Sequence, residues 1–210
     1  MNTIEQLNAA AQAGDINLLY TVIRNGPSIF ERIDLIPLVE TPLHIAALMG
    51  HLRFAIEIMR LKPSFALKLN EQGFSPIHIA MQNGHMTMVV SRFVKINKEL
   101  VRVQGREGLT PLHYASQIGE VEFIANFLFA CPNSIEDVTA RDETALHIAV
   151  KNEQFEALQV LVGWHKANYK KGARKLEFKI QNQKDEAGNT ILHISALSRE
   201  PQCLELGVTG

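Results

Sequence analysis

The chain has 210 residues, of which 46% are apolar and 20% charged, a balance typical of a folded protein with a sizeable core. Its formal net charge of −1 gives no overall positive field, so we expect no nucleic-acid partner. The N-terminus lacks the basic and then apolar pattern of a signal peptide, and no apolar run is long enough to span a bilayer. With only two cysteines as well, we expect a cytoplasmic protein.

A phrase of six residues recurs along the chain at nearly regular intervals. Its five clear copies begin 34, 35, 34 and 46 residues apart and read TPLHIA, SPIHIA, TPLHYA, TALHIA and TILHIS, starting at Thr41, Ser75, Thr110, Thr144 and Thr190. A diverged earlier copy begins at Leu7 and lacks the Thr and the His. Such repetition predicts a solenoid of stacked units, because one unit alone cannot bury its apolar face.

Each copy carries the signals of two antiparallel helices. The Thr or Ser can cap the first helix, and Pro suits the first helical position because its missing N–H is not needed there. A glycine then ends this helix by adopting a positive φ, in register at Gly14, Gly50, Gly84 and Gly119. Glu153 and Arg199 replace it in the last two copies. Apolar pairs behind it, such as Phe123/Ile124 and Phe127/Leu128, mark the buried face of the second helix.

The stretches between copies are rich in turn residues. NEQGFS from Asn70 and GREGLT from Gly105 predict projecting β-hairpin fingers. Asp142 stands where other fingers have Gly73, Gly108 and Gly188, and Asp tolerates the left-handed conformation. We therefore expect Asp142 to make the same turn.

A repeat of about 33 residues with the phrase T-P-L-H-x-A resembles the ankyrin repeat. The resemblance covers nearly the whole chain and implies an all-α solenoid of about six helix-turn-helix units, forming a single domain over residues 1–210. The expected repeats span about 3–36, 37–72, 73–106, 107–140, 141–185 with an insertion at 164–185, and an incomplete 186–210.

One histidine occupies the same position in each clear copy: His44, His78, His113, His147 and His193. Stacked helices lie about 8–10 Å apart, whereas two nitrogens bound to one zinc lie no more than about 4 Å apart. These rings are therefore not a metal site. In the ankyrin family the ring ties neighbouring repeats together by hydrogen bonds, so we expect a structural role.

The sequence contains none of the short motifs of common enzymes. There is no G-x-x-x-x-G-K-[ST], no G-x-S-x-G, no H-E-x-x-H and no paired-cysteine spacing. GREG at Gly105 is interpreted as a finger tip, since no strand-turn-helix frames it. We expect no catalytic residue, no cofactor and no metal, and hence a protein that acts by binding.

The long last interval, from LVGWHKANYKKG to NTILHIS, resembles an insertion in the plant ankyrin-transmembrane proteins of the bian-da and accelerated-cell-death group. Those proteins continue into a C-terminal membrane domain, the PGG domain, which this sequence lacks. The resemblance implies a protein-interaction module in plant immune and defence signal transduction. The alternative is the soluble N-terminal part of a membrane-anchored signalling protein whose activity lies in the missing domain.

A basic cluster lies in the insertion: Lys166, Lys170, Lys171, Arg174 and Lys175. One hypothesis is a weak contact with anionic lipid headgroups or with an acidic partner. The alternative is a solvated extension of a helix and its hairpin.

In ankyrin proteins the finger tips and the exposed positions of the first helix line a concave face that binds protein. The positions predicted to bind a protein partner here are Leu48, Met49, Phe74, Gln82, Asn83, Leu109, Gln117, Ile118 and Lys151. The apolar members among them would form an exposed strip, and such patches usually mark interaction sites. The alternative is that they pad contacts between repeats.

The last repeat is short, so the second helix of repeat five should be poorly covered. We expect Leu158, Leu161 and Val162 on that helix to remain partly exposed. A short second helix of repeat six is expected to begin at Pro201.

Overall fold

The computed structural model describes residues 3–85, 90–168 and 180–197. The chain divides into two compact units, Met1–Arg106 and Glu107–Gly210. This division coincides with the expected boundary between the third and fourth repeats. The helix expected from Pro201 lies outside the described residues.

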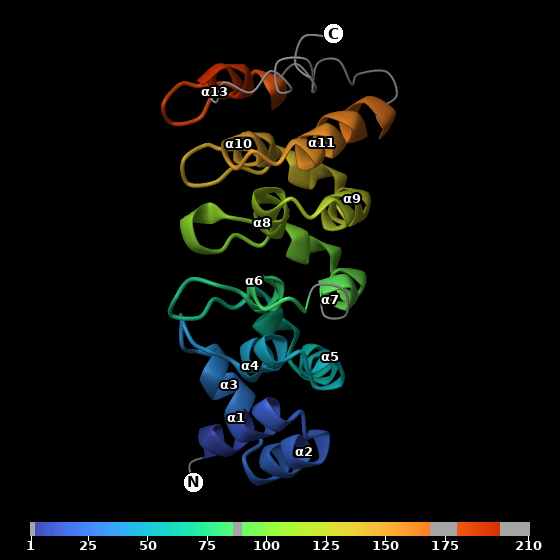
Figure 1. Ribbon diagram of the computed structural model, residues 1–210. Helices are drawn as coiled ribbons and strands as arrows, with labels where there is room; N and C mark the ends of the chain where they lie inside the picture. Colours follow the sequence, from blue (N-terminus) through green and yellow to red (C-terminus); the bar gives the residue numbers. More distant parts are fainter. Residues whose placement is uncertain (1–2, 86–89, 169–179, 198–210) are drawn as a thin grey trace. The chain divides into compact units, whose positions relative to one another are not determined.

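The first unit consists of helix pairs in the order that the repeats predict (Figure 1). The inner helix of each pair follows the Thr/Ser position, and the outer helix runs back behind it. Inner helices stack on one another, α1 on α4 and α4 on α6. The elements are α1 (Thr3–Ala13), α2 (Ile16–Asn25), α3 (Ile29–Asp34), α4 (Pro42–Met49), α5 (Leu52–Leu61), η1 (Pro63–Leu67), α6 (Pro76–Gln82), α7 (Ser91–Ile96) and η3 (Lys98–Arg102).

The second unit is built in the same way. Its inner helices stack in the order α8, α10, α13, and its outer helices α9 and α11 pack on each other (Figure 1). The elements are α8 (Pro111–Ile118), α9 (Val121–Ala130), η5 (Pro132–Glu136), α10 (Ala145–Lys151), α11 (Phe155–Asn168) and α13 (Ile191–Leu197), preceded by the turn η4 (Arg106–Gly108). The all-α repeat architecture expected from the sequence is confirmed.

The inner helices begin as the recurring phrase predicts. In α4 the Thr41 side chain accepts a hydrogen bond from the backbone N–H of His44, and the His44 ring in turn accepts from the Thr41 N–H. The same reciprocal cap starts α8 and α10. Two backbone donors that the first helical turn leaves without partners are satisfied in this way.

The inner helices end in a left-handed residue, also as expected. Gly50 follows α4 with φ +71°, and a Cβ atom built there would lie 2.7 Å from the ring of His85 in the next repeat. Glycine is therefore required by both the backbone and the packing. Glu153 takes the equivalent conformation with φ 57° at a place where the chain is exposed.

The fingers differ from the expected β-hairpins. No strand occurs among the described residues, and the fingers that begin at Asn70, Thr139 and Asp185 are instead compact turns. Each is closed by two backbone hydrogen bonds, such as Asn70 N–H to Phe74 O and Gly73 N–H to Asn70 O, both at 2.9 Å. The residue five positions before the helix cap holds the turn: Asn70, Thr139 and Asp185 each accept two backbone N–H groups with their side chains. These side-chain bonds replace a strand ladder. Asp142 has φ 57°, as expected.

The second helix of repeat five corrects one expectation. Leu158, Leu161 and Val162 are buried, not partly exposed. Helix α11 packs against α9 and α10, and this packing covers its apolar face.

The recurring histidines tie successive repeats together, as the ankyrin resemblance implied. Their Nε2 atoms reach the backbone carbonyl of the residue before the next cap: His44 to Phe74 O at 2.9 Å, His113 to Glu143 O at 3.1 Å and His147 to Asn189 O at 3.3 Å. Each ring thus links the start of its own helix to the next finger.

The protonation state of these rings follows from their partners. Because Nδ1 of His113 accepts from the Thr110 N–H, the ring proton must be on Nε2, where it is donated to Glu143 O. A second proton on Nδ1 would oppose the Thr110 N–H donor, so this contact disfavours the charged form of the ring. Burial lowers the pKa of His44 and of His113 to about 4, and it also lowers the pKa of His147.

These pKa values predict acid sensitivity. The unfolded chain takes up protons on these rings near pH 6.5, but the folded chain does so only near pH 4. The free energy of unfolding should therefore fall as pH is lowered from about 6.5 to 4, by up to about 3 kcal/mol for each of His44 and His113, and these two rings cause no further loss below pH 4. Chemical denaturation followed by circular dichroism at several pH values measures this slope.

Variants of two histidines provide the control. His113→Ala should lose about 1–3 kcal/mol at pH 7.5, because the Glu143 carbonyl and the Thr110 cap lose their partner, and should show a shallower pH slope. His193→Ala removes an exposed ring and should change both quantities less. A wild-type stability that is constant between pH 7 and 4.5 would contradict the assignment of neutral buried rings.

Candidate functional site

The last turn of each inner helix presents side chains to solvent. In the first unit, Leu48 and Met49 on α4 are exposed, as are Gln82 on α6 and Asn83 directly after it. The preceding turns of the same helices, such as Ala46 and Ala47, are fully buried. The cap therefore anchors each helix at its buried start and leaves its end open.

The second unit has the same arrangement. Gln117 and Ile118 are exposed at the end of α8, and Lys151 is exposed at the end of α10. The structure thus places these predicted residues at the solvent-facing ends of α8 and α10. Whether they bind a partner stays a prediction.

Asn83 has a second role that the sequence analysis missed. Its side-chain Nδ2 donates to the Ile79 carbonyl at 2.8 Å, and Asn152 makes the equivalent bond to Ile148 O in the second unit. Both residues follow an inner helix and donate a second hydrogen bond to a carbonyl that already accepts their own backbone N–H. A partner at Asn83 would therefore meet mainly the amide oxygen.

Two predicted residues are less accessible than expected. Phe74 and Leu109 are half-buried, not exposed. Phe74 packs its ring near that of His78, with centroids 6.4 Å apart, and its carbonyl accepts from His44. The position before the cap is turned inward because its carbonyl must meet the histidine of the preceding repeat.

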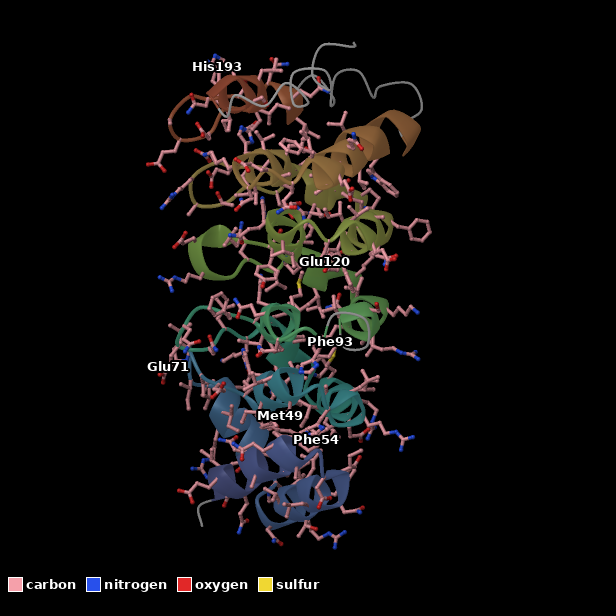
Figure 2. All side chains as sticks on the ribbon, in the orientation of Figure 1. Met49, Phe54, Glu71, Phe93, Glu120 and His193 are labelled. Carbon is pink, nitrogen blue, oxygen red and sulfur yellow. The ribbon has the colours of Figure 1, made fainter. Side chains whose placement is uncertain are left out.

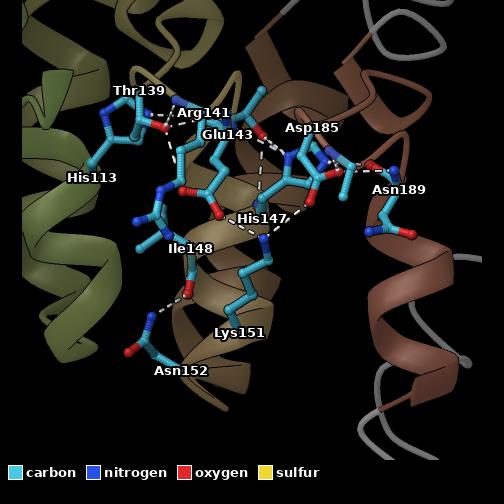
Figure 3. A network of polar contacts seen from close by, with 12 residues as sticks. His113, Thr139, Arg141, Glu143, His147, Ile148, Lys151, Asn152, Asp185 and Asn189 are labelled. Atoms are coloured by element: carbon cyan, nitrogen blue, oxygen red, sulfur yellow. Dashed lines mark hydrogen bonds and ion pairs between the residues drawn. The ribbon is translucent and has the colours of Figure 1, made fainter. Parts of the chain in front are cut away.

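Lys151 is the centre of a charged network in the second unit (Figure 3). Its ammonium lies 2.5 Å from Glu143 Oε1 and 3.0 Å from Asp185 Oδ2, and so joins the fingers of two successive repeats. Both carboxylates are buried. The second Asp185 oxygen accepts the backbone N–H groups of Ala187 and Asn189.

The pKa values of this network agree with its geometry. Burial alone would lower the pKa of Lys151, but the hydrogen bonds to Glu143 and Asp185 outweigh it and raise the pKa. Burial alone would raise the pKa of Asp185, but the bonds from the Asn189 N–H and from Lys151 outweigh it and lower the pKa. Lys151 and Asp185 are thus charged at neutral pH.

A shallow cavity of about 440 Å³ lies over this network, lined by Arg141, Glu143, Lys151, Asp185, Glu186 and Ala187. Three of its charged side chains, Glu143, Lys151 and Asp185, are paired with one another. This charged surface is suited to binding a polar group. Sequence reasoning found Lys151 but missed Asp185, whose signal was its place five residues before the cap at Thr190.

Other predicted features can be placed only in part. Of the basic cluster, Lys166 falls on the described helix α11, and Lys170, Lys171, Arg174 and Lys175 lie outside the described residues. Across residues 3–85, 90–168 and 180–197, no helix is long and apolar enough to cross a membrane. The same ranges hold no group of three His, Cys, Asp or Glu side chains placed to bind a metal ion.

The network predicts a cost for removing Lys151. Lys151→Met would leave two buried carboxylates facing each other, so the free energy of unfolding at pH 7 should fall by about 1–3 kcal/mol. The loss should shrink as the pH is lowered, because protonation of either carboxylate removes the repulsion between them. Lys184→Met, at an exposed position of the same unit, is the control. Equal effects of the two substitutions would show that the network contributes nothing to stability.

Known proteins share this sequence pattern. Residues 7–97 and 89–174 match the family described as ankyrin repeats (3 copies). The chain is 46% identical over 70 residues to the ankyrin repeat-containing protein BDA1 of Arabidopsis thaliana, a stretch that covers 33% of this chain and 16% of that protein.

Two further relatives are 29% identical over 126 residues each. They are Rabankyrin-5 of Mus musculus, with 59% of this chain and 10% of the relative covered, and the probable 26S proteasome regulatory subunit p28 of Saccharomyces cerevisiae, with 58% and 54% covered. The chain therefore spans about half or less of the length of these relatives. The match over residues 7–174, together with the capped and histidine-linked helix pairs, shows that the chain belongs to the ankyrin-repeat family.

Proposed function

We propose that this protein is a non-catalytic protein-binding module. The observation that carries the proposal is the set of solvent-facing side chains at the ends of the inner helices. In the first unit the binding residues are Leu48, Met49, Gln82 and Asn83, and in the second they are Gln117, Ile118 and Lys151. Phe74 and Leu109 contribute only the edges that remain accessible.

Exposed apolar side chains support this assignment. Leu48, Met49 and Ile118 lie on helices whose other apolar residues are largely buried, so these three do not serve the core of the described fold. Aliphatic groups next to amides provide both buried area and orientation when a partner covers them. Each of the two units has its own apolar and polar side chains at the ends of its inner helices.

The first-unit surface is tested by charge insertion. Leu48→Glu combined with Met49→Glu should abolish capture of specific partners from plant extract, because a carboxylate cannot be buried there without a cation. Helical content should stay unchanged, since both side chains are exposed. Captured proteins are identified by mass spectrometry and compared between variants.

The matched control is Ile96→Glu, which inserts a charge at another exposed apolar position of the same unit. A partner that is lost equally with both variants, or retained by both, would argue against this surface. Loss of helical signal in the double variant would show that Leu48 and Met49 belong to the core.

We further propose that the module acts in plant immune and defence signal transduction. The likeness to BDA1 over 70 residues and the resemblance of the insertion to that of the bian-da group support this. The alternative is that the chain is the N-terminal part of a membrane-anchored signalling protein, with its activity in a C-terminal domain.

Both versions are tested in leaf tissue. Expression of the wild-type chain should alter the elicitor-induced oxidative burst, whereas Leu48→Glu with Met49→Glu should not and Ile96→Glu should act like wild type. An identical burst in all plants would contradict the defence role. Recovery of the native protein in a detergent-soluble membrane fraction would favour the anchored alternative.

A further inference from the structure

The linker between the first two repeats carries an unusual run of exposed apolar residues. Leu35, Ile36, Pro37 and Leu38 are consecutive, and all four are exposed, Leu35 to 83% and Leu38 to 50%. Three or more consecutive exposed apolar residues indicate either a functional surface or a solubility defect. No other part of the described chain exposes four in a row.

The other linkers show that this run is not required by the repeat. In the second, third and fourth linkers, the first residue of a buried pair lies ten positions before the next cap, as Phe65 does before Ser75. In the first linker, Ile29 lies twelve positions before Thr41. Leu67 in the second linker is also exposed, at 52%. The equivalent residues of the third and fourth linkers are charged: Arg102 and Glu136.

The two apolar segments lie side by side. The Asp34 carboxylate receives a hydrogen bond from Ser64 at 3.0 Å, and Leu38 forms a parallel bridge with Leu69. Residues 34–39 therefore run along residues 64–69. Together they form one surface, here called the first-linker patch, which consists of Leu35, Ile36, Leu38 and Leu67.

Opposite charges flank the two ends of the first-linker patch. At one end Lys62 and Lys68 share the single carboxylate of Asp34, at 2.8 and 3.6 Å, which leaves one positive charge in excess. At the other end the parallel register places Glu40 opposite Glu71. Both glutamates are exposed, Figure 2 shows Glu71 at the edge of its finger, and neither carboxylate has a cationic partner among the described residues.

We propose that the first-linker patch binds a second copy of this chain across a two-fold axis. A two-fold pairing is self-complementary and can run the two patches antiparallel. The basic end of each copy then meets the two glutamates of the other, while the four apolar side chains pack in the centre. The arrangement supplies the cation that Glu40 and Glu71 lack and removes the exposed run from water.

The small area of the first-linker patch limits the affinity of the dimer. Four apolar side chains per copy bury less than a standard interface, so the dissociation constant should be roughly 10–1000 µM and should rise with salt. This surface uses residues other than those of the proposed partner-binding surface. Its success or failure is therefore independent of that proposal.

Sedimentation velocity of the full chain under reducing conditions tests the dimer over a concentration series. Wild-type protein should shift from monomer to dimer with concentration. Leu35→Ser with Leu38→Ser should stay monomeric, with at least a tenfold rise in dissociation constant. Ile96→Ser, at an equally exposed apolar position, and Leu48→Glu with Met49→Glu should dimerise like wild type.

A charge exchange tests the orientation. Glu40→Lys with Glu71→Lys makes both ends of the patch positive, whereas Lys62→Glu makes both ends negative and leaves Lys68 on Asp34. Each variant alone should be monomeric because like ends meet. An equimolar mixture should recover a dimer, because opposite ends meet in the mixed pair.

Three outcomes would overturn the proposal: a wild-type monomer at all concentrations, a dimer that survives Leu35→Ser with Leu38→Ser, or a mixture of the charge variants that stays monomeric. A monomer that binds a different protein through Leu35 and Leu38 would also overturn it. Circular dichroism melting curves confirm that each variant is folded.

Discussion

The rest of the structure depends on a neutral imidazole buried between two repeats. Nδ1 of His44 closes the cap at Thr41 of its own helix, and Nε2 donates to the Phe74 carbonyl of the next finger. One side chain therefore fixes both where an inner helix begins and where the following repeat sits. Because the ring is enclosed and has a donor on one side and an acceptor on the other, it functions only in its uncharged form.

This constraint also decides where binding surface is available. The start of an inner helix is buried by the cap and the ring, and the residue before the cap is turned inward where it meets the histidine of the preceding repeat, as Phe74 shows. Only the last turn, with Leu48 and Met49 on α4, is free to vary without disturbing the stack. The second unit departs from this at Lys151, whose side chain lies at a variable position but joins Glu143 to Asp185 and so adds an ionic link between repeats.

Much of this was predictable from the sequence because the signals are local and repeated. The caps at Thr41 and Thr110, the left-handed glycines and the substitute Asp142 each follow from one residue's own conformational preference. The half-burial of Phe74 was not predictable, since it depends on a histidine thirty residues away. The network of Lys151 was missed for the same reason: Asp185 lies across a long insertion, and no spacing rule links the two. Hairpin strands were expected in the fingers and do not occur among the described residues. Side-chain acceptors such as Asn70 close these turns without a strand ladder.

The first repeat shows the consequence of losing the imidazole. Asn8 occupies the position of His44, and its Oδ1 is buried without a hydrogen-bond partner among the described residues. The asparagine side chain is shorter than a histidine ring, so we expect that it does not bridge to the next finger as the rings do. Compared with the second to fourth linkers, the linker after α2 has two additional residues, a short helix α3 in place of a 3₁₀ turn, and the exposed run from Leu35 to Leu38. The repeat that lacks the buried ring is thus followed by the linker that departs from the repeat geometry, and this linker carries the apolar surface.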